Sequence, residues 1–196
     1  MMDAAERHIS KTIRTFVAVK VKPDKAAEEL LAEIRKALRD EAIVWNRTAN
    51  FHVTLLFIGD TSPEQIAPVQ QALNRIAMQA KPFGFSVSGL GVFRTIHRPR
   101  VLWLGVNSSF ELANLKRLTD EELFPVLKLD SREMFKPHLT IGRMRKIDDL
   151  QNLSELIGKY AGTQFLRVKV EEILFYQSIT TPEGPIYQVL SAHPLK

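Results

Sequence analysis

Hydrophobic residues follow two different spacings along the chain. Residues 12–21 are rich in β-branched and aromatic side chains, which predicts a strand. Pro23 follows at a position typical of a helix start, and apolar residues then recur at helical spacing over 24–40. Residues 51–58 return to strand character and end at Gly59. The first third of the chain therefore predicts the order strand, helix, strand.

The rest of the chain continues this alternation. Ser62 followed by Pro63, with Gln65 three residues after the serine, is typical of a capped helix start, and this helix should run to about Ala80. We expect further helices at 109–124 and 148–159, and strands at 83–93, 100–107, 136–144, 163–177 and 185–193. Strands and helices mixed in this way, without low-complexity linkers, predict an α+β fold.

The amino-acid composition excludes several kinds of functional site and favours others. The chain has 196 residues and no cysteine, which excludes disulfides, thiolate metal sites and cysteine nucleophiles. No stretch of about 18 apolar residues occurs, so a cytosolic location is the default expectation. The formal net charge of +5 favours anionic partners. We expect residues 1–11 to be a flexible extension and 12–196 to form one domain.

Two short motifs of the form His-x-Thr carry the functional signal. His52 and Thr54 lie two residues apart in one predicted strand, and His138 and Thr140 do so in another. Strand side chains alternate between faces, so each histidine should share a face with its threonine. The apolar residues on the opposite face should enter the core, and these are Val53, Leu55 and Phe57 in the first strand and Leu139 and Ile141 in the second.

A single His-x-Thr triplet in a half-exposed strand is unremarkable, because threonine favours strands. Two copies in the similar segments HVTLLFIG and HLTIG indicate an ancient duplication, with each lobe supplying one wall of a cleft. Histidine titrates near pH 6.5 and can act as acid or base. Two facing imidazoles suit phosphodiester hydrolysis, with threonine hydroxyls as donors to the phosphate oxygens.

Further segments extend the pattern beyond these motifs. They are RTFVAV at 14–19, the approach from Trp45 to His52, RPRVLWLGV at 98–106, FKPHLTIGR at 135–143 and YQSITTPEGPIY at 176–187. With both His-x-Thr motifs, the chain resembles the 2H phosphoesterases over about residues 12–193. Within them it is most similar to the LigT-like RNA 2′,3′-cyclic phosphodiesterases, also called 2′-5′ RNA ligases.

This resemblance implies a bilobal fold in which two pseudo-symmetric lobes of antiparallel sheet plus helices surround a central cleft. It also implies hydrolysis of 2′,3′-cyclic phosphate ends to 2′-phosphates by expulsion of O3′, without a metal or other cofactor. The implied partner is an RNA or oligonucleotide with a 2′,3′-cyclic phosphate end. Separately, we expect a monomer and no membrane partner.

Carried over by position, the resemblance makes His52 and His138 the catalytic acid and base. Thr54 and Thr140 become phosphate-oxygen donors, and Arg143 a phosphate or nucleotide contact. It favours His52 as the acid on O3′, although the residues themselves do not order the pair. Strict alternation would place Arg143 on the face opposite Thr140, so its role requires a bend near Gly142 or a long reach.

Other residues are candidates for weaker roles. Phe57 or Trp45 could stack on the terminal base, and Tyr187 could line the cleft. Arg100 belongs to a basic loop, with Arg94, His97 and Arg98, that could touch the RNA backbone. His8 and His193 lack a threonine partner and lie near the termini, where we expect surface positions.

Several other functions fit parts of this pattern. The same site could run in reverse as a ligase, or could act on a small cyclic nucleotide or a 2′-5′ oligonucleotide. A non-catalytic RNA-binding module would keep the fold but tolerate His52→Ala. A zinc hydrolase is disfavoured, because the sequence has no H-E-x-x-H motif.

Overall fold

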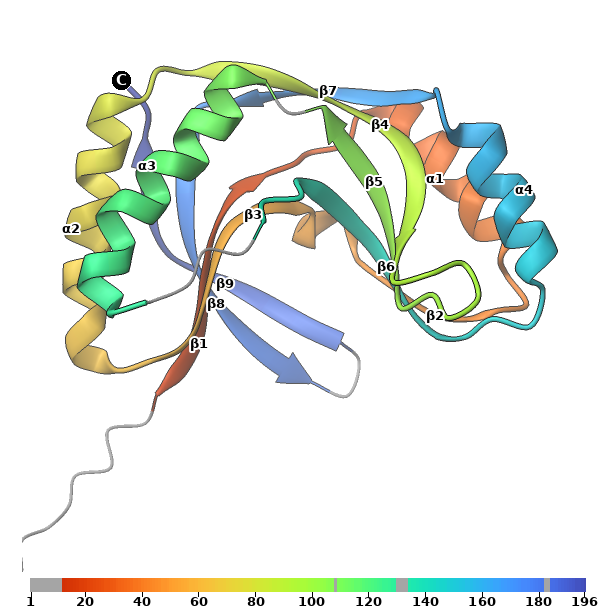
Figure 1. The fold of residues 1–196 in the computed structure, drawn as a ribbon, viewed down its shortest axis with the longest axis horizontal. Coiled ribbons are helices and arrows are strands. Elements are labelled where there is room, and N and C mark those ends of the chain that lie inside the picture. The colour runs from red at the N-terminus through yellow and green to blue at the C-terminus, as the bar shows by residue number, and fades with distance from the viewer. Residues whose placement is uncertain (1–11, 108, 130–133, 182–183) are drawn as a thin grey trace, which may run out of the picture.

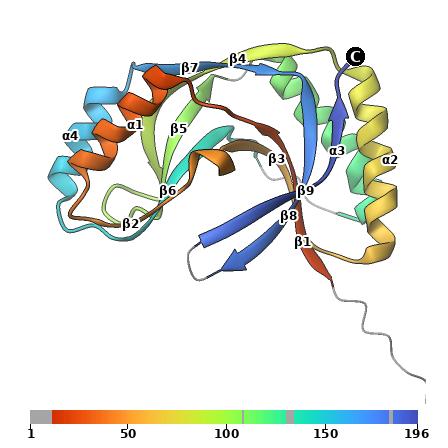
Figure 2. The ribbon, with the colours of Figure 1, turned by 180° about the vertical axis from the view of Figure 1, so that it is seen from behind.

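Two antiparallel sheets form the framework of the protein in a computed structural model that describes residues 12–107, 109–129, 134–181 and 184–196 (Figures 1 and 2). The first sheet has the order β3-β1-β8-β9 and the second β2-β6-β5-β4-β7. The strands of the first sheet are β1 (Ile13–Lys20), β3 (His52–Thr61), β8 (Glu172–Thr181) and β9 (Gly184–Pro194). Those of the second are β2 (Ala42–Trp45), β4 (Phe83–Phe93), β5 (Val101–Asn107), β6 (His138–Lys146) and β7 (Gln164–Val170).

Two helices cover the outer side of each sheet (Figures 1 and 2). The helices α2 (Pro63–Gln79) and α3 (Phe110–Leu127) pack on the first sheet, and α1 (Lys25–Ala37) and α4 (Leu150–Tyr160) pack on the second. A short 3-10 turn, η1 (Thr48–Asn50), precedes β3. We call the first sheet with α2 and α3 the first lobe, and the second sheet with α1 and α4 the second lobe. The expected bilobal α+β fold is confirmed.

The chain crosses between the lobes more than once. Helix α1 follows a strand of the first sheet but packs on the second, and α3 follows a strand of the second sheet but packs on the first. Local signals still set where helices begin: Asp24 accepts a hydrogen bond from the Ala27 backbone N–H at 2.8 Å, and Ser62 and Gln65 form the predicted capping box.

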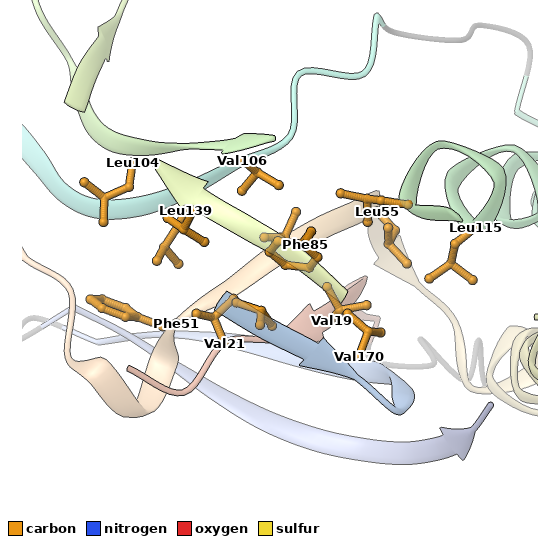
Figure 3. Packing of buried hydrophobic residues seen from close by; sticks show 14 of the residues in the cluster. Val19, Val21, Phe51, Leu55, Phe85, Leu104, Val106, Leu115, Leu139 and Val170 are labelled. Carbon is orange, nitrogen blue, oxygen red and sulfur yellow. The ribbon is translucent and has the colours of Figure 1, made fainter. Parts of the chain in front are cut away.

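A single cluster of buried apolar side chains includes residues of both lobes (Figure 3). Leu55 of β3 and Leu115 of α3 come from the first lobe, and Leu104 of β5 and Leu139 of β6 from the second. Truncating a leucine in such a core to alanine costs about 2–5 kcal/mol. The shared core therefore holds together the two sheets that carry the His-x-Thr motifs.

Some sequence predictions were wrong. The expected strand at 163–177 is two strands, β7 in the second sheet and β8 in the first, with the change of sheet at Glu171. Both parts are apolar and no glycine or proline separates them, so the pattern reads as one strand. The short strand β2 was not predicted. Residues 1–11, expected to be a flexible extension, lie outside the described residues.

His193 is also not on the surface, since only 3% of it is exposed. Its Nδ1 lies 2.7 Å from Asn74 Oδ1 on α2, and its Nε2 lies 2.8 Å from Ser191 Oγ. An amide oxygen can only accept, so Nδ1–H donates to Asn74 and the serine hydroxyl donates to Nε2. This buried histidine ties β9 to α2 and takes no part in the cleft.

None of the helices in the described part of the chain is both long enough and apolar enough to cross a membrane.

Candidate active site

His52 and His138 stand at the first positions of β3 and β6, on different sheets. They lie close enough that the charge of His138 lowers the pKa of His52. A hydrogen bond to the backbone carbonyl two residues earlier orients each ring. Nδ1 of His52 lies 2.6 Å from the Asn50 carbonyl oxygen, and Nδ1 of His138 lies 2.7 Å from that of Lys136. A carbonyl only accepts, so Nδ1 carries a proton in each ring. In the neutral form, Nε2 is then the free basic nitrogen.

An aromatic ring stands edge-on to each imidazole. Tyr187 lies 5.0 Å from His52 at an interplanar angle of 89°, and Phe93 lies 4.5 Å from His138 at 90°. Phe16 lies 4.9 Å from His52 and 5.0 Å from Tyr187, so the three rings pack together. The structure thus brings Tyr187 into the site. The sequence did not predict Phe93 and Phe16 as site residues. In an apolar strand, the neighbouring residues do not distinguish an aromatic side chain in the core from one that faces a cleft.

Burial lowers the pKa of both histidines. It is the main cause that brings the pKa of His52 to about 4, and the charges of His138 and Arg143 lower it further. Burial likewise lowers the pKa of His138, with Arg143 as a second cause. The hydrogen bonds to backbone carbonyls oppose the shift at both rings. In the free protein at neutral pH, the neutral imidazole is therefore favoured at both positions.

Thr54 and Thr140 share a face with their histidines, as alternation predicts. Val53 and Leu55 are buried on the other side of β3, and Leu139 and Ile141 on the other side of β6. Thr54 pairs with Ala18 in the neighbouring strand, and Thr140 pairs with Trp103. Each lobe therefore presents one imidazole and one hydroxyl to the cleft.

Arg143 reaches the histidines because β6 is irregular. Gly142 pairs with Leu102 and Thr140 with Trp103, which leaves Ile141 without a partner on β5. This extra residue reverses the alternation and returns Arg143 to the face of Thr140. The charge of Arg143 lowers the pKa of both histidines and acts on Tyr187 of the opposite lobe. The bend near Gly142 that the sequence analysis required is present.

Asn46 holds this irregular segment from the side of β2. Its side-chain Nδ2 donates to the Thr140 carbonyl at 2.8 Å, and its backbone N–H donates to the Ile141 carbonyl at 2.9 Å. Its own carbonyl accepts from Arg35 at 3.1 Å, and that guanidinium lies 5.7 Å from the centre of the Trp45 ring. Trp45 is thus packed under an arginine of its own lobe.

The core position predicted for Phe57 was wrong. In β3, Leu56 pairs with Val17 and Thr54 with Ala18, which leaves Leu55 without a partner and reverses the alternation after it. Phe57 therefore pairs with Phe16 on the cleft side and is 68% exposed.

Arg100 is exposed immediately before β5. Its carbonyl accepts a hydrogen bond from the Met144 N–H at 2.9 Å, which ties the basic loop to β6 through the backbone. A contact of its guanidinium with RNA stays a prediction.

Three or more histidine, aspartate or glutamate side chains are nowhere grouped as metal ligands within the described ranges, and the chain has no cysteine. The two histidines, two threonines and one arginine offer proton transfer and hydrogen bonding to an anion. They match the needs of phosphodiester hydrolysis in charge and in proton-carrying groups.

Comparisons with known proteins agree with this geometry. The chain is 35% identical over 181 residues to the RNA 2′,3′-cyclic phosphodiesterase of Archaeoglobus fulgidus, covering 91% of this chain and 98% of the relative. It is also 35% identical to the protein of that name from Aquifex aeolicus, covering 92% and 96%. The crystal structure of Escherichia coli LigT in apo form shares the fold, with a TM-score of 0.74 at 22% identity over 95% of this chain and 99% of that one. The family model described as LigT like Phosphoesterase matches residues 19–103 and 106–187, and the chain belongs to this family.

Proposed function

We propose that this protein hydrolyses 2′,3′-cyclic phosphate ends of RNA to 2′-phosphates by acid/base catalysis with His52 and His138. The observation that carries this proposal is the paired geometry: each Nδ1–H is held by a backbone carbonyl, which leaves Nε2 to take or give a proton in the cleft. The names of the relatives in Archaeoglobus fulgidus and Aquifex aeolicus support RNA as the substrate class.

In the proposed reaction, one neutral imidazole takes a proton from water as the water oxygen attacks phosphorus. The bond from phosphorus to O3′ breaks, and the other histidine, as imidazolium, gives its proton to O3′. The product carries a 2′-phosphate and a 3′-hydroxyl. Each proton transfer is worth roughly 10²–10⁴ in rate. Thr54, Thr140 and Arg143 stabilise the negative charge that develops on the non-bridging oxygens.

The order of acid and base depends on how the bound phosphate changes the two pKa values. For His52 to be the acid, as the family resemblance favours, the anion must raise a pKa that is about 4 in the free protein. A substrate with sulfur in place of O3′ needs little help from an acid, because a thiolate leaves readily. Such a substrate should restore the rate of the variant that lacks the acid and not of the variant that lacks the base.

The main test is hydrolysis of an RNA oligonucleotide with a 2′,3′-cyclic phosphate end, in the presence of EDTA. We expect the wild type to form the 2′-phosphate, and His52→Ala and His138→Ala each to lose about 10²–10⁴ in kcat. Lys25→Ala is the control, because Lys25 is exposed at the start of α1 on the outer side of the second lobe, and it should keep full activity. Unchanged turnover in either cleft variant would contradict the mechanism, and dependence on metal would contradict metal independence.

We further propose that the protein acts as a monomer in the cytosol.

The reverse joining of a cyclic phosphate end to a 5′-hydroxyl uses the same groups by microscopic reversibility, but water favours hydrolysis. If the wild type binds the oligonucleotide without turning it over, and His52→Ala binds equally well, the protein is an RNA-binding module instead.

A further inference from the structure

Acidic side chains are absent from the strands of the second sheet. Neither aspartate nor glutamate occurs in these strands or in the loop that joins β4 to β5, whereas β3 of the first sheet carries Asp60 and β8 carries Glu172. On this loop and on β6, the charged residues are Arg94, Arg98, Arg100, Arg143, Arg145 and Lys146. A surface with charges of one sign attracts a polyanion, so the second lobe is the one that favours an RNA chain.

The loop between β4 and β5 begins beside the catalytic histidine of the second lobe. The ring of Phe93 lies 4.5 Å from that of His138, and Arg94 follows with a φ of 72°, in the left-handed region, which turns the chain sharply. Val101, the first residue after the loop, pairs with Phe93 on β4 and with Arg143 on β6. The loop therefore leaves the sheet at the row that contains Arg143 (Figure 1).

This loop is held in place although it lies on the surface. The Arg100 N–H donates to the Phe93 carbonyl at 3.3 Å, which closes the loop. The Met144 N–H of β6 donates to the Arg100 carbonyl at 2.9 Å, and Ile96 packs against the buried core. Arginines on a loop that is fixed in this way lose less conformational freedom when they bind an anion.

Arg145 adds a further cation from β6. It lies two residues after Arg143, and Met144 between them is buried on the opposite face. Arg145 therefore starts on the same face as Arg143, farther along the strand from His138. We call Arg94, Arg98, Arg100 and Arg145 the arginine rim, and all four are exposed.

The arginine rim has no acidic partner in the described part of the chain. None of the ion pairs within those ranges includes one of its four guanidinium groups. By contrast, Arg75 on α2 pairs with Glu122, and Arg117 on α3 pairs with Glu121. A guanidinium presents several N–H donors in a plane and binds phosphate oxygens in pairs. The rim therefore offers unused phosphate-binding groups beside the catalytic site.

We propose that the arginine rim binds the phosphodiester groups of the RNA chain on the 5′ side of the nucleotide that carries the cyclic phosphate. The proposal rests on the proposed function, because the cyclic phosphate must lie between the histidines. That phosphate ends its chain at the 3′ side, so the rest of the RNA leaves the site through the 5′ oxygen. A single nucleoside cyclic phosphate has no such phosphodiester. The rim therefore makes the protein favour the ends of RNA chains over mononucleotides, whatever their sequence.

The test compares kcat/KM for adenosine 2′,3′-cyclic phosphate with that for an RNA oligonucleotide of about six nucleotides with the same end. We expect the wild type to favour the oligonucleotide by at least about tenfold at low salt. For the oligonucleotide, log kcat/KM should fall with log salt concentration by about 0.7 for each phosphate that the protein binds. The rim variant Arg94→Gln/Arg98→Gln/Arg145→Gln should lose most of this preference and of this salt dependence, with kcat/KM for the mononucleotide unchanged.

The matched control removes the same number of positive charges from the outer side of the molecule. Lys25 on α1, Lys81 just after α2 and Lys159 on α4 are all exposed. Lys25→Gln/Lys81→Gln/Lys159→Gln has the same net charge as the rim variant and should keep the preference for the oligonucleotide. An equal loss in this control would overturn the proposal, because the charge of the whole protein and not the rim would then attract the RNA.

The remaining outcomes separate the rim from the catalytic site. Equal wild-type values of kcat/KM for the mononucleotide and the oligonucleotide would overturn the rim, and so would a rim variant that loses as much on the mononucleotide. If the wild type hydrolyses neither substrate, the proposed function fails. Equilibrium binding of an oligonucleotide with a 2′-phosphate end then still tests the rim, and equal affinities of the wild type and the rim variant at low salt would overturn it.

Discussion

The strands β3 and β6 present their histidines in the same way but place them in different surroundings. Both rings donate Nδ1–H to the carbonyl two residues earlier, and both face an aromatic ring edge-on. His52, however, lies among Phe16, Tyr176 and Tyr187, where burial brings its pKa to about 4. His138 borders an open cavity. The backbone sets the direction of each imidazole, and the neighbouring side chains set how readily it takes a proton.

The same two strands also show how one local irregularity can serve two purposes. An unpaired residue three positions after each histidine turns the residue five positions after it toward the cleft. Phe57 in the first lobe and Arg143 in the second are the results. The two strands thus share their local geometry, while the exposed position carries different chemistry in each.

The largest loss of activity should follow when the threonine hydroxyl of either lobe is removed. Thr54→Val and Thr140→Val each keep the side-chain shape but remove a donor to the phosphate, so we expect each to lower kcat by about 10²–10³. Hydrolysis of a cyclic phosphate oligonucleotide measures the effect of both changes. Thr12→Val is the control, because Thr12 is exposed before β1, at the end of that strand remote from His52. If one variant keeps the wild-type kcat, the two lobes do not stabilise the phosphate equally.

A smaller loss should follow when the support of the β6 irregularity is removed. Asn46→Ala deletes the hydrogen bond to the Thr140 carbonyl, so Arg143 should be less well held and activity should fall about tenfold, as expected for misplaced catalytic groups. If Asn46 acts through Arg143, the change should cost little in an Arg143→Ala background.

The control for this prediction is Asn152→Ala, which removes a similar amide bond to the Ala37 carbonyl at 3.0 Å, remote from the cleft. Fully additive losses in the double variant would show that Asn46 acts independently of Arg143.

The smallest effect we predict is in the pH dependence of the free enzyme. Catalysis needs one charged and one neutral histidine, and both pKa values lie below 6.5. The rate constant kcat/KM should therefore peak below pH 6.5 and fall as pH rises, by about threefold between pH 6.5 and 7.0, because the charged form is lost. Arg143→Gln should move the descending limb to higher pH, since its charge lowers both pKa values. An optimum above pH 7 would show that the surroundings do not hold both rings neutral.

Sequence alone predicted those features that depend on neighbouring residues in the chain. Strand alternation placed Thr54 and Thr140 on the faces of their histidines, and the capping pattern at Ser62 marked the start of α2. These signals are local because they arise from backbone geometry and from hydrogen bonds within one turn. The two His-x-Thr motifs, with the segments around them, were enough to indicate the family that the comparisons show.

Only the tertiary structure decided which residues face the cleft beyond those motifs. Phe57 and Arg143 changed sides because strand pairing leaves Leu55 and Ile141 without partners, and this register depends on β1 and β5, which are distant in sequence. The apolar run at 163–177 could not show that its two halves join different sheets. An alternating pattern records that a side chain is apolar or polar, but the partner strand determines which side of the sheet it occupies.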